Sequence, residues 1–212
     1  MTNDSIHQYV VEEQLDELRE ASYRLNVEQH GRLLGRQLRD EVIVSFEYDT
    51  GLRVDELLDI KPDGMLRLNE GELVIPGPIQ KDYPNENSPS TRTLTLDRSD
   101  IGLVRLLRQY LNSEWYQSQD TDYLLPTRQS NQMTPRAVNQ TIKRLAAEAD
   151  VRPYRTDGTR GEPQGLSAHD FRHSVANWML QDEENRLVDV RNRLRHSSIL
   201  TTEQIYEHFI RA

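Results

Sequence analysis

Apolar residues recur at intervals of three and four along most of this chain, a spacing that places them on one face of an α-helix. This pattern indicates helices over residues 1–36, with a loop, and around 37–50, 52–60, 101–116, 135–149, 166–180, 187–195 and 201–209. The helix at 37–50 is expected to be amphipathic and to end at Gly51. Strand-like runs occur only between residues 65 and 96: MLRLN, ELVIP and TRTLTL. We therefore expect an α+β fold that is mostly α-helical, with a small three-stranded antiparallel sheet.

The chain has 212 residues, enough for one good-sized core or one domain with an appendage. It contains no cysteine, which excludes disulfides, thiolate metal sites and cysteine nucleophiles. Its mean hydropathy is -0.79, and no apolar run approaches the ~20 residues of a membrane span. The acidic N-terminus lacks the apolar core of a signal peptide. These features predict a cytoplasmic protein.

Acidic residues outnumber basic ones, with 35 Asp and Glu against 26 Lys and Arg, and the formal net charge is -9. This balance alone argues against a nucleic-acid-binding protein, whose surface is usually basic. The only lysines are Lys61, Lys81 and Lys143. Such a composition is typical of a halophilic protein, for example one from a salt-loving archaeon or its virus or mobile element. At ~1 M salt the Debye length falls to ~3 Å, so an acidic surface would hardly repel DNA.

The stretch LSAHDFRHSVANWML, residues 166–180, begins a helix with an unusual cluster of charge. It places His169, Asp170, Arg172 and His173 within five positions. Burying such groups is costly unless they are paired. They form either a capped, solvated helix start or a cluster that converges on something negative. A cap formed by the first two residues does not account for the arginine and histidine one turn later.

Four separated patches, in this order, resemble the sequence boxes of the tyrosine recombinase (phage integrase) family, over roughly residues 37–210. DTGLRVDELLDIK is similar to the first box, and IPGPIQKDYPNENSPSTRTLTL is similar to the hairpin that carries the family lysine. HDFRH is similar to the H-x-x-R box, and LRHSSILTTEQIYEH to the last box. One patch alone is a weak signal, whereas the four together do not follow from an ordinary helix cap.

The resemblance implies a nucleophile and a phosphate clamp. Breaking a phosphodiester without a metal needs a nucleophile, an acid for the leaving oxygen and fixed positive charge for the transition state. By resemblance, Tyr206 attacks DNA and holds its 3′ end as a phosphotyrosine. Arg53 and Arg172 are implied to clamp the phosphate, because arginine keeps its charge and binds phosphate oxygens with two parallel donors.

The remaining roles also follow from the resemblance. Lys81 is implied to protonate the 5′ oxygen, His169 to act as general acid and base, and His196 to donate a hydrogen bond to a non-bridging oxygen. Glu56 is expected to orient the arginine and histidine cluster, and His173 is interpreted as structural. The implied catalytic set is Arg53, Lys81, His169, Arg172, His196 and Tyr206, with Glu56 in support and no metal or cofactor.

Two features of the last box differ from the usual family pattern. Arg195 stands where the family usually has a glycine, and it is either tolerated in the turn or in contact with phosphate. Tyr206 lies ten residues after His196, one more than is common. If the extra residue lies in the loop, the tyrosine keeps its place. If the extra residue lies within the helix, the tyrosine rotates by about 100° away from the site.

The helix over residues 135–149 is a candidate DNA surface. Thr134 as N-cap and Pro135 at the first position predict its start. Its apolar side comprises Val138, Ile142, Leu145 and Ala149, and its opposite side carries Arg136, Gln140, Lys143 and Arg144. The polar side is either a solvated helix face or a DNA-binding face. By resemblance, the matching helix of the family lies close to DNA, in or beside the major groove.

The resemblance also implies a domain organisation and a function. It predicts an N-terminal helical extension at residues 1–36 and a tyrosine recombinase catalytic domain at residues 37–212. The implied activity is site-specific recombination of double-stranded DNA, by dimers or tetramers and with an accessory protein as a further candidate partner, away from membranes. One alternative is a non-catalytic DNA-binding regulator or accessory factor, which forms no covalent adduct. Another is a type IB topoisomerase-like nicking-closing enzyme, which relaxes plasmid without a defined site.

Overall fold

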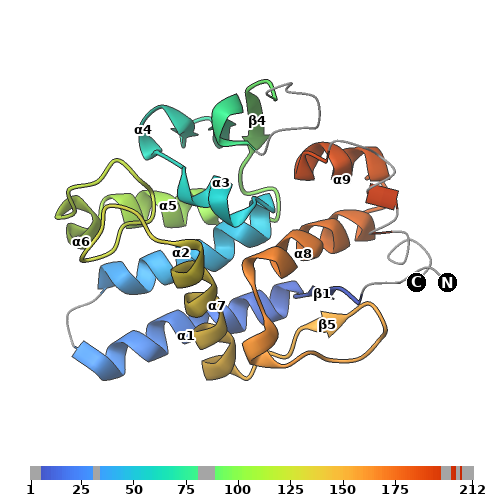
Figure 1. Cartoon of the computed structure of the whole chain (residues 1–212), viewed down its shortest axis with the longest axis horizontal. Helices are drawn as coiled ribbons and strands as arrows, with labels where there is room; N and C mark the ends of the chain where they lie inside the picture. Colours follow the sequence, from blue (N-terminus) through green and yellow to red (C-terminus); the bar gives the residue numbers. More distant parts are fainter. Residues whose placement is uncertain (1–5, 31–33, 81–88, 197–201, 204–205, 207–212) are drawn as a thin grey trace.

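Figure 1 shows the computed structural model, which describes residues 6–30, 34–80, 89–196, 202, 203 and 206, without the side chains of residues 26–30, 34 and 35. The helices are α1 Glu12–His30, α2 Leu34–Thr50, α3 Val54–Leu58, α4 Pro62–Met65, α5 Leu103–Leu111, α6 Glu114–Gln117, α7 Pro135–Ala149, α8 Ala168–Gln181 and α9 Leu187–Leu194, with 3₁₀ turns η1 Gly77–Ile79 and η2 Pro163–Gly165. The strands are β1 Gln8–Tyr9, β2 Leu66–Arg67, β3 Glu72–Ile75, β4 Arg92–Thr95 and β5 Tyr154–Arg155.

Helix α2 lies at the centre of the fold, and α1, α5, α7 and α8 pack around it (Figure 1). Every residue from 37 to 50 is buried. The prediction that this helix is amphipathic is therefore wrong, because neighbouring helices cover all of its sides. Several of its charged side chains, which were expected to face solvent, are instead paired. Glu41, for example, accepts hydrogen bonds from Arg19 at 3.0 Å and from Tyr23 at 2.6 Å.

The predicted three-stranded sheet is confirmed. The strands are antiparallel in the order β2-β3-β4, with Leu73 opposite Leu94 in the β3–β4 pair. Both leucines are buried in the main core, which anchors the sheet to the helices. A second, two-stranded sheet pairs β1 with β5. The sequence did not predict it, because two-residue strands are too short for an alternating pattern.

Residues 101–116 form the two helices α5 and α6, and the prediction of one continuous helix is wrong. Asn112 and Ser113 interrupt it. The Asn112 side chain donates a hydrogen bond to the Arg108 carbonyl at 2.8 Å, and the Ser113 hydroxyl accepts one from the Tyr116 backbone at 3.2 Å. Asn and Ser favour such local bonds to the backbone over continued helix.

Helix α7 follows its prediction closely. The Thr134 hydroxyl caps the helix by accepting a hydrogen bond from the Ala137 backbone at 3.2 Å, and Pro135 occupies the first position. The predicted apolar side faces the core: Val138, Ile142 and Leu145 are buried, and Ala149 is half-buried. The opposite side is therefore left for solvent or a ligand.

Helix α1 packs against α2 and α7, and Leu15 and Leu18 are buried in the same core as α2. The division of the chain at residue 36 stays a prediction about domain organisation. In the part of the chain that the structure describes, no helix is both long enough and apolar enough to span a bilayer.

Candidate active site

The start of α8 positions the H-x-x-R residues. Asp170 Oδ2 accepts hydrogen bonds from the Ser167 backbone N–H at 2.8 Å and from its hydroxyl at 2.7 Å. Asn139 of α7 accepts another from the Ala168 N–H at 3.0 Å. The helix start is therefore capped, with Ser167 as the N-cap residue. The cap does not leave the next turn in solvent, because Arg172 is only 3% exposed.

Arg172 connects the first box with the last. Its Nη1 donates to the Gly51 carbonyl at 2.5 Å, and its Nη2 donates to the Leu194 carbonyl. Burial lowers the pKa of Arg172 to about 9, and the nearby charges of Arg53 and Arg195 act in the same direction. A guanidinium with this pKa still carries its charge at neutral pH. The guanidinium of Arg172 therefore binds backbone carbonyls of both the first box and the last box.

Gly51 allows this close approach. It ends α2, as predicted, and its φ of +59° is the left-handed conformation that glycine adopts without strain. A Cβ atom at this position would lie 2.6 Å from Cδ2 of Leu194. A larger residue would therefore separate the end of α2 from the end of α9.

Glu56 holds two arginines. Its Oε1 accepts a hydrogen bond from Arg53 Nη1 at 3.3 Å. Its Oε2 accepts from the Arg53 backbone at 2.9 Å and from Arg195 Nη2 at 2.5 Å. Burial raises the pKa of Glu56, but the charges of Arg195 and Arg53 outweigh it, and the net pKa lies below the usual value. The carboxylate is thus ionised and links the first box to the last.

Arg195, at the position where the resemblance expects a glycine, has a glycine-like backbone conformation. Its φ of +55° is left-handed, as a glycine's would be, and it ends α9. Its side chain is 5% exposed and pairs with Glu56. The backbone therefore agrees with the expectation that an arginine is tolerated in the turn, and the side chain binds the Glu56 carboxylate. Contact of Arg195 with phosphate stays a prediction.

Tyr206 lies within the site. Its ring stacks on His196, with centroids 6.0 Å apart and an interplanar angle of 9°, and meets His173 edge-on at 5.6 Å. It is 1% exposed. Burial raises the pKa of Tyr206 to about 12, although Arg172 and Arg53 act to lower it. The extra residue before Tyr206 therefore does not turn the phenol away from the arginines.

The histidines of the boxes are held in the neutral form. Burial and the charges of Arg172 and Arg53 lower the pKa of His196 to about 3. Its Nδ1 lies 2.9 Å from Thr202 Oγ1, so the other ring nitrogen, Nε2, is left for a substrate. The pKa of His169 is also lowered, first by partial desolvation and then by Arg172, although the residue is exposed at the surface.

Two histidines that sequence reasoning did not assign to the site lie next to it. The His173 ring centroid is 4.4 Å from that of His7 and 4.9 Å from that of His169, and His173 is 2% exposed. Its spacing of four residues from His169 places both on one helix face, a signal that could have found it. His7 gave no such signal, because it is brought there by the short β1 strand.

Lys81, the predicted acid for the leaving oxygen, lies outside the described residues. Its neighbour Gln80 is buried, and the Gln80 Nε2 atom donates to the carbonyls of Ile75 at 3.1 Å and Ser90 at 3.0 Å. One of these carbonyls belongs to β3, and the other lies just before β4. Gln80 therefore ties together the two ends of the segment that carries the lysine.

The polar side of α7 is partly open. Arg136, Gln140 and Lys143 are exposed, whereas Arg144 is half-buried and donates to Asp40 Oδ2 at 2.6 Å. Three of the four predicted DNA-binding side chains are therefore available at the surface, and the fourth is held by a buried carboxylate.

Together these residues form a site suited to a phosphate ester. A phenol lies beside guanidinium groups and neutral imidazoles, the combination that can supply a nucleophile, fixed positive charge and hydrogen-bond donors. Within the described residues, no three His, Asp or Glu side chains lie together as metal ligands do.

Known proteins share both the sequence pattern and the fold. Residues 11–211 match the model of the phage integrase family. The tyrosine recombinase XerC of Alcanivorax borkumensis is 30% identical over 171 residues, covering 81% of this chain and 48% of that protein. XerD of Rhizobium meliloti is 30% identical over 175 residues, with 82% and 48% covered. The chain thus spans about half the length of these curated relatives.

Solved structures confirm the predicted fold class. The XerA recombinase superimposes with a TM-score of 0.68 at 22% identity, covering 94% of this chain and 60% of that one. XerH bound to palindromic difH substrate, in a post-cleavage complex, gives 0.63 at 18% identity, with 94% and 49% covered. The family match, the relatives and the mostly helical fold with small antiparallel sheets agree. The chain belongs to the phage integrase family.

Proposed function

We propose that this chain is the catalytic part of a site-specific DNA recombinase, which cleaves and rejoins double-stranded DNA through Tyr206. The observation that carries the proposal is the convergence of distant segments. Arg172 binds the backbone of the first and last boxes, and the Tyr206 ring stacks on His196. Relatives named tyrosine recombinases, and XerH bound to its DNA substrate, support the same activity.

In the proposed reaction the Tyr206 oxygen forms a bond to the scissile phosphorus, and the bond to the 5′ oxygen breaks. The phenolic proton passes to His169, whose neutral imidazole can accept it. Lys81 gives a proton to the leaving 5′ oxygen. The phosphotyrosine retains the energy of the broken bond, so attack by a 5′ hydroxyl of another strand rejoins DNA without ATP.

The other groups stabilise charge during this step. Arg53 and Arg172 bind the non-bridging oxygens, where negative charge develops. His196 donates from Nε2 to one of these oxygens, because Thr202 occupies its Nδ1. Glu56 keeps Arg53 in position through its two bonds to that residue.

The nucleophile and one arginine of the site are buried, whereas His169 is exposed and Arg53 is half-buried. Because Arg172 is 3% exposed and Tyr206 is 1% exposed, we propose that binding of a DNA phosphate is accompanied by a rearrangement that uncovers the phenol. Strand exchange also needs two DNA sites, and we propose that the protein self-associates on DNA as dimers or tetramers, with or without an accessory protein.

Covalent capture tests this function. The protein is incubated with sheared genomic DNA over a range of KCl up to molar, and SDS-resistant protein–DNA adducts are quantified. We expect adducts with the wild type and none with Tyr206→Phe. Tyr123→Phe is the matched control, because this tyrosine lies beside Lys61, outside the catalytic set, and should leave adduct formation unchanged.

The same assay separates the alternatives. DNA binding without an adduct at any salt would favour a non-catalytic regulator or accessory factor. Relaxation of supercoiled plasmid, with captured ends scattered over many sequences, would favour a topoisomerase-like enzyme. Captured ends that share one sequence would identify the recombination site.

A further inference from the structure

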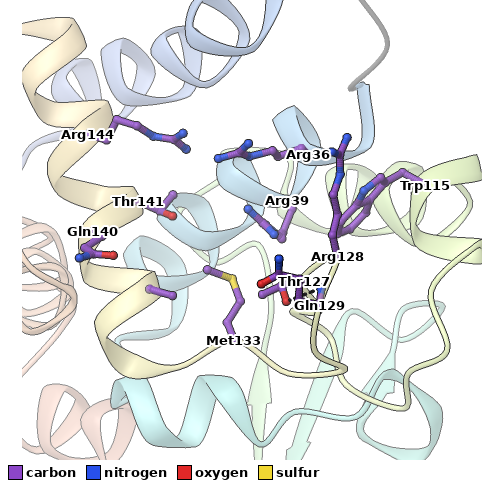
Figure 2. A pocket seen from close by; sticks show the side chains of 11 residues that line it. Arg36, Arg39, Trp115, Thr127, Arg128, Gln129, Met133, Gln140, Thr141 and Arg144 are labelled. Atoms are coloured by element: carbon purple, nitrogen blue, oxygen red, sulfur yellow. Dashed lines mark hydrogen bonds between the residues drawn. The ribbon is translucent and has the colours of Figure 1, made fainter. Parts of the chain in front are cut away.

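A pocket of about 450 Å³ lies apart from the catalytic residues, between α2, α6, α7 and the loop at residues 127–133. Figure 2 shows four arginines whose side chains converge on it from three parts of the chain. They are Arg36 and Arg39 of α2, Arg128 of the loop and Arg144 of α7. The lining residues in the described part of the chain include no carboxylate.

One buried carboxylate beneath the pocket fixes two of the four arginines. Asp40 is 0% exposed, and its Oδ1 accepts a hydrogen bond from Arg39 Nη2 at 2.9 Å. Its Oδ2 accepts one from Arg144 Nη2 at 2.6 Å. Arg39 also donates to the Pro126 carbonyl at 3.1 Å and lies over the Trp115 ring. Both guanidinium groups are therefore held in place before any ligand arrives.

The other two arginines, Arg36 and Arg128, are available to pair with an anionic ligand. Within the described residues, neither Arg36 nor Arg128 forms an ion pair. The Arg36 Nε atom is buried and has no hydrogen-bond partner among those residues. Burial lowers the pKa of Arg36. The charge of Asp40 acts to raise this pKa, and the charges of the other three arginines lower it further. This crowding of like charge is relieved when an anion binds.

We propose that this arginine pocket binds a backbone phosphate of duplex DNA. The inference rests on the proposed function and adds a second contact point away from the scissile phosphate. Gln140 and Arg144 line the pocket and also belong to the polar side of α7, so a duplex along that side passes the pocket mouth. Arginine forks match phosphate oxygens, and such contacts position a protein on DNA without reading sequence.

The test is the salt dependence of binding to a labelled duplex of random sequence, measured by fluorescence anisotropy. The full chain is used over the KCl range in which circular dichroism shows it folded. Arg36→Gln and Arg128→Gln remove charge without breaking a described ion pair. Each is expected to reduce the slope of log K against log[KCl] by about 0.9. Arg105→Gln, at an exposed position of α5, is the matched control and leaves the slope unchanged.

The outcomes separate this inference from the proposed function. If both pocket variants keep the wild-type slope while Arg136→Gln and Lys143→Gln lower it, the pocket does not bind DNA, and the proposed function stands. If the slope is kept but sedimentation shows altered self-association, the pocket binds a partner chain, and the inference is overturned. If the folded wild type binds no duplex, the proposed function fails as well.

Discussion

Arg195 Nη2 lies 2.5 Å from Glu56 Oε2, and both side chains are almost completely buried. The same carboxylate binds Arg53, so the first and last boxes share one counter-charge. A left-handed backbone costs a non-glycine residue about 1–2 kcal/mol. The buried ion pair offsets this cost, which explains how an arginine is accommodated at a position with a glycine-like backbone.

The ion pair predicts an order of stability among variants at residue 195. We expect Arg195→Gly to lower the free energy of unfolding by about 2–3 kcal/mol. Removing one partner of a buried pair costs about 3–5 kcal/mol, and glycine recovers part of it by relieving the left-handed strain. Arg195→Ala loses the pair and keeps the strain, so it should be the less stable of the two by about 1 kcal/mol. Urea unfolding at constant KCl measures both, and equal stability of the two variants would contradict the left-handed backbone.

Glu56 predicts a loss of stability in acid. Its pKa in the folded protein lies below the usual value of 4.5. Its contribution is therefore fully present above about that pH and is lost as the pH falls through the folded-state pKa. Glu56→Gln lacks this titration. The difference in unfolding free energy between wild type and variant should shrink as the pH is lowered below 4.5. A constant difference down to pH 3 would show that this carboxylate is not the ionised partner of the arginines.

Glu47 predicts the opposite dependence. It is fully buried in α2, and neither of its carboxylate oxygens has a hydrogen-bond partner among the described residues. Burial raises its pKa well above 4.5, although Arg172 acts to lower it. Protonated Glu47 is therefore favoured in the folded state. The stability that this preference gives is present below about pH 4.5 and is lost as the pH rises.

Glu47→Gln keeps the shape of the side chain and removes the charge. We expect its melting temperature to exceed that of the wild type at pH 8 and to approach it at pH 4.5. Asp49→Asn serves as a contrast. Asp49 is paired with Arg193, so this variant should melt below the wild type at pH 8. A Gln variant that melts below the wild type at pH 8 would mean that an ionised Glu47 stabilises the nearby arginines.

Local signals predicted the parts of the fold that local chemistry determines. The cap of α7 at Thr134, its buried Val138 side and the stop of α2 at Gly51 depend on neighbouring residues alone, and all three were predicted correctly. The burial of α2 on every side was missed, because it depends on packing against four helices, three of which lie far from α2 in the sequence. The break at Ser113 was missed because apolar spacing continues across it while one hydroxyl caps the next helix.

The candidate site, too, has residues that the sequence predicted and residues that it did not. The resemblance placed Arg53, Arg172 and Tyr206 in one site, and the structure brings them within electrostatic reach of one another. The sequence motifs gave no sign of His7, which arrives through a two-residue strand, or of the partner that Arg195 finds in Glu56. These contacts join residues more than a hundred positions apart, and a single sequence carries no pattern for such pairs.

Thr202 is predicted to act by positioning His196. It is 0% exposed, and its Oγ1 lies 2.9 Å from His196 Nδ1. Its hydroxyl proton can satisfy Nδ1, which leaves the imidazole proton on Nε2 for a phosphate oxygen. Thr202→Val keeps the volume and removes the hydrogen bond. We expect the rate of adduct formation to fall about fivefold, corresponding to a hydrogen bond of about 1 kcal/mol.

Thr202→Ser separates positioning from packing, because serine restores the hydroxyl and lacks the methyl group. If the hydrogen bond orients the imidazole, the serine variant recovers most of the wild-type rate of adduct formation, even where its melting temperature is lower. If packing alone matters, valine is the better substitute, and it retains the rate that serine loses. The two variants therefore give opposite orders under the two roles, and the rate of phosphotyrosine formation on a captured site decides between them.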